Sequence, residues 1–108
     1  MKSIKIINDH IYLGGIFTHF KGNGASWTYA RNGARLDING KPDRTWNPEF
    51  NGSVIDIDVD ENEDYYYAAG YFTRAHNQVV ENAGRVSTAA GAALDSSWTF
   101  QHSYLIGK

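Results

Sequence analysis

The chain has 108 residues, enough for one domain at most, and its 42% hydrophobic content is sufficient for a core. Ten Lys and Arg residues against twelve Asp and Glu residues give a net charge of −2. Proteins that bind nucleic acid usually carry a stripe of basic residues, so we expect no nucleic-acid partner. The absence of cysteine excludes disulfides, thiolate metal sites and a cysteine nucleophile.

The N-terminal segment is not a signal peptide, because Lys5, Asn8 and Asp9 interrupt its apolar stretch. No apolar run reaches the roughly 20 residues that a helix needs to cross a bilayer. We therefore expect cytoplasmic synthesis without membrane insertion. The virion and the extracellular space stay open as final locations.

The next segments predict strands and turns. Aromatic residues make up 14% of the chain, and eleven glycines accompany only two prolines, a composition typical of all-β proteins. Residues 11–17 are apolar at both parities, which predicts a strand covered on both faces. Asn39-Gly40 predicts a hairpin turn between the third and fourth strands of the first half of the chain. Asn51-Gly52 marks the junction between the first half and the second. The doubly apolar pattern returns at residues 65–72.

Residues 54–64 combine a strand with an acidic run. The alternation predicts a half-exposed strand with three apolar side chains on one face: Ile55, Ile57 and Val59. The spacing from Asp56 to Asp64 is similar to that of a calcium loop. However, Glu63 stands where an EF-hand requires glycine, and Ala69 stands where it requires glutamate. We therefore interpret the run as an acidic strand face and a polar turn, and expect no metal.

An internal repeat of about fifty residues organises the chain. Four blocks recur in the same order, and in both copies an aspartate precedes a tryptophan by three residues. The recurring residues include Tyr12 and Tyr67, Phe17 and Phe72, Asn32 and Asn82, Arg35 and Arg85, Asp43 and Asp95, and Trp46 and Trp98. We predict one copy at residues 2–52, a second at 53–101, and at 102–108 a strand that starts a third unit or completes a neighbouring subunit.

Each copy is predicted to contain four antiparallel strands, which is typical of a β-propeller blade. A single closed barrel of eight strands is the alternative architecture. Two blades cannot close a ring, so we expect a partial propeller that is completed by oligomerisation or by a partner chain. Three copies would supply six blades, and four would supply eight.

The repeated motifs resemble those of the delta-60 repeat, a β-propeller family of bacterial and phage proteins. The similarity covers nearly the whole chain: Gly-x-Phe-Thr, then Asn-x-x-Arg followed by Leu or Val, then Gly, then Asp-x-x-Trp. The tryptophan and Ala69 depart from its pattern, as does the long segment at 21–29. The resemblance implies a propeller with a scaffold or binding role in a phage tail, a virion or a bacterial surface assembly. It implies no catalytic residues.

The recurring charged and aromatic residues are candidate structural positions. Arg35 and Asp43, like their counterparts in the second copy, predict an ion pair that ties strands or blades together, with ligand recognition as the alternative. The recurring phenylalanines and tryptophans predict packing within or between blades. Trp27 and Tyr29 have no counterpart, and two interpretations stay open: stacking on a sugar ring and packing at a blade edge.

The leading hypothesis is a non-catalytic structural or interaction module, with no cofactor. A small lectin that forms an oligomeric propeller is the alternative, and its partner would be a glycan. An enzyme is not expected, because no acid, base and nucleophile stand in a recognisable arrangement. The four histidines share no metal-ligand spacing.

Overall fold

The computed structural model describes residues 2–23 and 26–98, and these residues form strands, turns and loops without a helix. The strands are β1 (Ser3–Ile7), β2 (His10–Gly14), β3 (His19–Lys21), β4 (Trp27–Tyr29), β5 (Gly33–Asp37), β6 (Val54–Val59), β7 (Tyr65–Gly70), β8 (Arg74–Ala75), β9 (Gln78–Val79) and β10 (Ala83–Ser87). The predicted all-β class is confirmed. In these ranges no helix could span a membrane. The end of the predicted second copy and the predicted strand at 102–108 lie outside the described residues.

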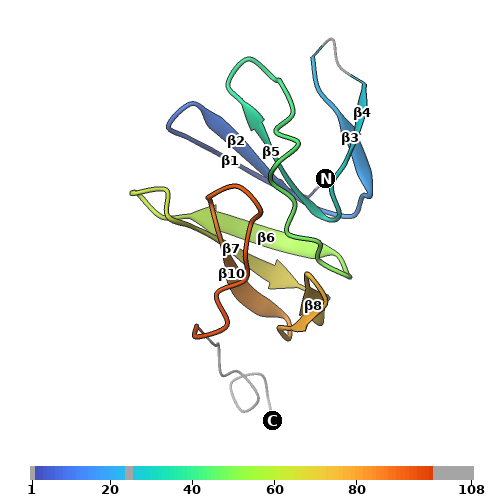
Figure 1. Cartoon of the computed structure of the whole chain (residues 1–108), viewed down its shortest axis with the longest axis vertical. Helices are drawn as coiled ribbons and strands as arrows, with labels where there is room; N and C mark the ends of the chain where they lie inside the picture. Colours follow the sequence, from blue (N-terminus) through green and yellow to red (C-terminus); the bar gives the residue numbers. More distant parts are fainter. Residues whose placement is uncertain (1, 24–25, 99–108) are drawn as a thin grey trace.

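Two three-stranded antiparallel sheets lie one on the other (Figure 1). Sheet 1 has the order β1-β2-β5, and sheet 2 has the order β10-β7-β6. The hairpin β3–β4 lies beside sheet 1, and the hairpin β8–β9 lies beside sheet 2. Because hydrogen bonding divides the described strands among separate small sheets, the alternative of one closed barrel is wrong for this part of the chain.

The prediction of four strands per sheet is also wrong. After the third strand, the chain makes only an isolated bridge, Leu36 to Pro42 in sheet 1 and Val86 to Leu94 in sheet 2. Pro42 has no N–H group and cannot extend a ladder. Beyond each bridge, a single hydrogen bond joins the returning chain to the third strand, from Asp43 N–H to the Arg35 carbonyl at 2.9 Å in sheet 1.

The pattern of burial corrects two further predictions. The register of β6 shifts between Val54 and Asp56, and such a bulge reverses the side-chain parity. Val54 is therefore buried and Ile55 is 43% exposed, so Ile55 does not share a face with Ile57 and Val59. Coverage on both faces is wrong at Ile16 and Tyr71, which follow the last paired residues of β2 and β7 and are 65% and 76% exposed.

The hydrophobic core lies between the two sheets. The rings of Trp46 and Tyr66 meet edge to face with centroids 4.9 Å apart, and those of Phe50 and Phe72 lie 4.6 Å apart. A Cβ atom added at Gly14 would lie 2.7 Å from Cγ2 of Ile57, so a glycine at this point allows the sheets to approach closely.

Candidate interaction sites

Arg35 and Asp43 form an ion pair at the margin of the inter-sheet core. The Nε and Nη2 atoms of Arg35 donate to Oδ2 of Asp43 at 3.0 and 2.7 Å. The N–H and hydroxyl groups of Thr45 donate to Oδ1 at 2.9 and 2.6 Å. Burial acts to raise the pKa of Asp43, but the Thr45 and Arg35 hydrogen bonds outweigh it and hold that pKa below its ordinary value. The carboxylate is therefore charged and fixed.

The same arginine and the neighbouring tryptophan connect sheet 1 to the end of β10 and to the residue that follows it. Nη1 of Arg35 donates to the Thr88 carbonyl oxygen at 2.5 Å. Nε1 of Trp46 donates to the Ser87 carbonyl oxygen at 2.9 Å, and the Trp46 side chain is only 1% exposed. The predicted packing role of Trp46 thus takes the form of a contact between sheets.

Glu63, in the turn between β6 and β7, also joins the two sheets, through the tyrosine hydroxyl to which Arg35 donates. One of its carboxylate oxygens accepts from the hydroxyl of Tyr12 at 2.5 Å and lies 2.5 Å from Nδ1 of His10. Burial, together with the Glu63 contact, raises the pKa of Tyr12 above its ordinary value. Tyr12 therefore stays protonated and acts as the donor.

A third contact runs between the edge strands β1 and β6. Nζ of Lys5 lies 3.3 Å from Oδ1 of Asp58, and the hydroxyl of Ser3 donates to Asp56 at 3.4 Å. Both aspartates belong to the acidic strand face identified in the sequence. Because these side chains are largely exposed, the contact contributes more to orientation than to stability.

A second set of arginine, aspartate, tyrosine and tryptophan, at the matching repeat positions, lies on the side of sheet 2 that faces away from sheet 1. Nε of Arg85 donates to Oδ2 of Asp95 at 2.9 Å, and its Nη1 donates to the hydroxyl of Tyr67 at 3.1 Å. The rings of Tyr67 and Trp98 meet edge to face at 5.5 Å, the distance that also separates Tyr12 and Trp46.

The two sets differ in what covers them. The side chain of Arg35 is 8% exposed, whereas that of Arg85 is 22% exposed. Trp98 is half-buried, and with Tyr67 it lines a shallow hollow of about 380 Å³ on the surface of sheet 2. Within the described ranges, no other sheet packs on this side.

The recurring phenylalanines share a backbone position but not an environment. The carbonyl oxygen of Phe17 accepts from Asn32 at 2.9 Å, and that of Phe72 accepts from Asn82 at 3.0 Å. Phe72 is fully buried in the core between the sheets. Phe17 is half-buried and instead contacts Phe20, at 6.5 Å between centroids.

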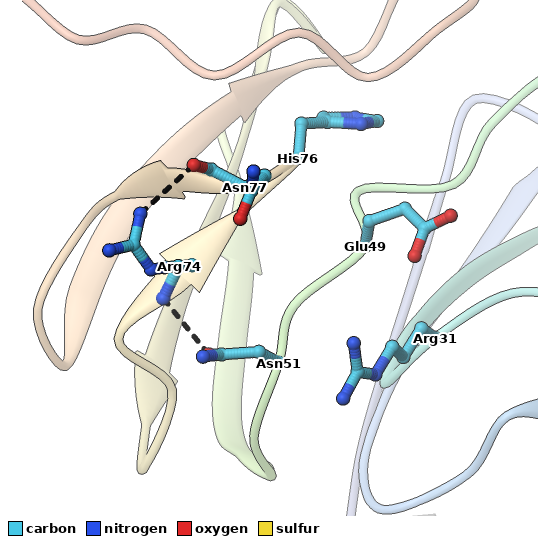
Figure 2. Close-up of a pocket in the computed structure, with 6 residues that line it drawn as sticks. All are labelled: Arg31, Glu49, Asn51, Arg74, His76 and Asn77. Atoms are coloured by element: carbon cyan, nitrogen blue, oxygen red, sulfur yellow. Dashed lines mark hydrogen bonds between the residues drawn. The ribbon is translucent and has the colours of Figure 1, made fainter.

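A polar cleft of about 420 Å³ opens between the hairpin β8–β9 and the chain that precedes β6 (Figure 2). It is lined by Arg31, Glu49, Asn51, Arg74, His76 and Asn77. Several polar groups of the cleft bond to one another. Oδ1 of Asn51 accepts from the Arg74 N–H at 2.9 Å, and Nη1 of Arg74 donates to the Asn77 carbonyl at 3.0 Å. The guanidinium group of Arg31 has no hydrogen bond to another described residue.

Trp27 and Tyr29 lie side by side on the outer face of β4, 64% and 46% exposed. The hydroxyl of Tyr29 donates to Glu49 at 2.7 Å, and this bond is the main cause of its raised pKa. Glu49 also lines the polar cleft, so the aromatic pair and the cleft are contiguous. Nζ of Lys21 lies over the Trp27 ring, 5.8 Å from its centroid.

The acidic run at the β6–β7 turn has a local role. Oδ1 of Asp60 accepts from the N–H groups of Asp64 and Tyr65 at 2.8 and 2.9 Å, which closes the turn. The described residues contain no cluster of three or more His, Asp or Glu side chains placed to hold a metal ion.

The predicted site residues omit several that carry the contact between sheets. Tyr12 and Tyr67 recur within the first repeated block, so their recurrence was a usable signal. Glu63 and Lys5 have no chemically matching counterpart, and their partners are more than fifty positions away in the sequence. No local pattern in the sequence could have identified those two.

Comparisons with protein-family models, with curated proteins and with solved structures find no match to this chain. The similarity to the delta-60 repeat therefore stays a prediction from the motifs.

Proposed function

We propose that this chain is a non-catalytic structural and interaction module, namely two neighbouring blades of a β-propeller whose ring is completed by other copies or by a larger partner protein. One observation carries the proposal. The arrangement of arginine, aspartate, tyrosine and tryptophan that joins sheet 1 to sheet 2 occurs again on sheet 2, facing outward. A surface of this kind is suited to receive another sheet.

The opposite side of the pair of sheets supports the same proposal. Ile4 and Ile6 of β1 are 54% and 59% exposed, and they lie on the side of sheet 1 that faces away from the core. Exposed isoleucines on a regular sheet surface, next to backbone edges, favour association with another polypeptide. A phage tail, virion or bacterial surface assembly as the setting follows from the motif resemblance alone.

Sedimentation of the purified chain in dilute buffer tests the proposal. We expect a species heavier than the monomer, or a stable complex once the partner is present. A folded monomer that retains its β-sheet circular dichroism spectrum and captures no partner would contradict the proposal.

Carbohydrate binding is the second candidate function, and the contiguity of two exposed aromatic rings with a polar cleft favours it. Trp27 and Tyr29 offer flat surfaces on which a sugar ring can stack, and Arg31 and Glu49 offer a donor and an acceptor beside them. A glycan array probed with the wild type and with Trp27→Ala tests this function. Specific signals that the variant loses would support it, and an array without signals would reject it.

A further inference from the structure

The outward side of sheet 1 matches the buried side of sheet 2 residue by residue. Its side chains, which we call the isoleucine face, are Ile4, Ile6, Ile11, Leu13, Ala34 and Leu36. They form two rows across the strands, Ile4–Leu13–Ala34 and Ile6–Ile11–Leu36. The rows that sheet 2 buries against sheet 1 are Ile57–Ala68–Gly84 and Val59–Tyr66–Val86. The two faces thus share register and apolar chemistry.

The outward side of sheet 2 matches the buried side of sheet 1 in the same way. We call it the tyrosine face: Asp56, Asp58, Tyr67, Ala69, Ala83, Arg85 and Trp98. Its central row is Asp58–Tyr67–Arg85, and the corresponding buried row of sheet 1 is Lys5–Tyr12–Arg35.

We infer that the isoleucine face of one copy of this chain docks head to tail on the tyrosine face of a second copy, repeating the contact that joins sheet 1 to sheet 2. This inference rests on the proposed function and names its partner and its surfaces. Each copy would use its isoleucine face for one neighbour and its tyrosine face for the other, which makes the interface heterologous. Such an interface builds a ring when the rotation between successive copies adds up to a full turn.

The proposed contact brings together side chains of different size from those that meet within the chain. Within the chain, a Cβ atom added at Gly14 would lie 2.7 Å from Cγ2 of Ile57 and 3.2 Å from the hydroxyl oxygen of Tyr66. In the proposed contact, the larger Ala69 takes the place of Gly14, and the smaller Ile11 takes the place of Tyr66. Ile4 keeps the place of the isoleucine that lies closest to Gly14, and Leu13 takes the place of the smaller Ala68. The two sheets must therefore lie farther apart in the proposed contact than within the chain.

The charges favour a second copy over an unrelated partner. Lys5 contacts Asp58 within one chain, and these residues hold equivalent positions in β1 and β6, each opposite a central tyrosine. Repetition of the contact between copies would place Asp58 of one copy next to Lys5 of the following one. Lysine and aspartate would then alternate along the whole series of edge strands, and every charge would have opposite neighbours.

A mixing experiment with one variant for each face tests the inference. Ile6→Asp places a charge on the isoleucine face, and Ala69→Glu places one on the tyrosine face. Each side chain is exposed within the chain, so folding should survive. Ile16→Asp is the matched control, because Ile16 is 65% exposed but lies outside both faces. Should either variant lose its β-sheet spectrum, Ile4→Asp and Ala83→Glu address the same faces.

Each face variant alone should sediment as a monomer, with association weakened by about a hundredfold or more, because an unpaired carboxylate would be buried. An equimolar mixture should form a one-to-one dimer, because one intact face remains on each variant. The control should assemble like the wild type. If the wild type assembles and the face variants do also, the docking mode is wrong while the proposed function stands. If the wild type itself remains a folded monomer without a partner, both are wrong.

Discussion

Two tryptophans at the same repeat position have different surroundings, and this difference is measurable. Trp46 is almost fully buried between the sheets and donates a hydrogen bond to Ser87, whereas Trp98 is half-buried on the tyrosine face. In the monomeric Ile6→Asp background, Trp46→Ala should lower the free energy of unfolding by about 3–5 kcal/mol. Trp98→Ala should lower it by much less. Urea unfolding measures both losses, and equal losses would contradict the assignment of the two faces.

The Asp43 carboxyl group should make stability depend on pH. Its pKa in the folded protein lies below its ordinary value, so folding favours the charged form. The resulting stability is present above an unfolded-state pKa of about 3.9 and is lost as the pH falls through the lower folded pKa.

Asp43→Asn should therefore cost about 1–2 kcal/mol at pH 7, a range that allows for the partial exposure of the ion pair. The difference from the wild type should shrink as the pH approaches 3. Thermal unfolding at both pH values measures it, with Glu61→Gln at an exposed turn as the control. A difference that is the same at both pH values would show that the carboxylate charge is not involved.

At the scale of elements, the close approach of β2 to sheet 2 predicts a steric coupling. Gly14→Ala would bring a methyl group against Ile57 and Val54, and we expect a destabilisation of about 1–3 kcal/mol. The double variant Gly14→Ala/Ile57→Ala should be more stable than the sum of the two single effects implies, because the added methyl then fills the space that Ile57 leaves. Strict additivity in urea unfolding would mean that these residues do not touch.

The sequence predicted the elements better than their surroundings. The strands around Tyr12 and Tyr67 follow from apolar runs, and the Arg35–Asp43 pair follows from its recurrence. The shift at Ile55 did not follow, because a bulge depends on pairing with distant chain. The shortened fourth strand of sheet 1 had a local signal in Pro42, which lacks the N–H group that a ladder needs. Alternation could likewise indicate that Ile4 and Ile6 share a face, but not that both side chains are exposed in the fold.

At the scale of the whole molecule, the proposed alternation of lysine and aspartate along the edge strands predicts how reversing these charges changes assembly. Lys5→Asp and Asp58→Lys each place like charges side by side at every contact between sheets, so each should weaken assembly. The double variant Lys5→Asp/Asp58→Lys restores opposite neighbours and should recover most of the association. Sedimentation at low and high salt measures this recovery, and the differences among variants should fade at high salt. A double variant as weak as either single variant would argue against the alternation.

The mass of the intact species under native conditions tests the proposal that the two sheets form part of a larger ring. We expect a discrete assembly of three or four copies, equivalent to six or eight sheets around one axis. A native mass spectrum that shows only the folded monomer at every concentration, with no larger species and no partner retained, would contradict it.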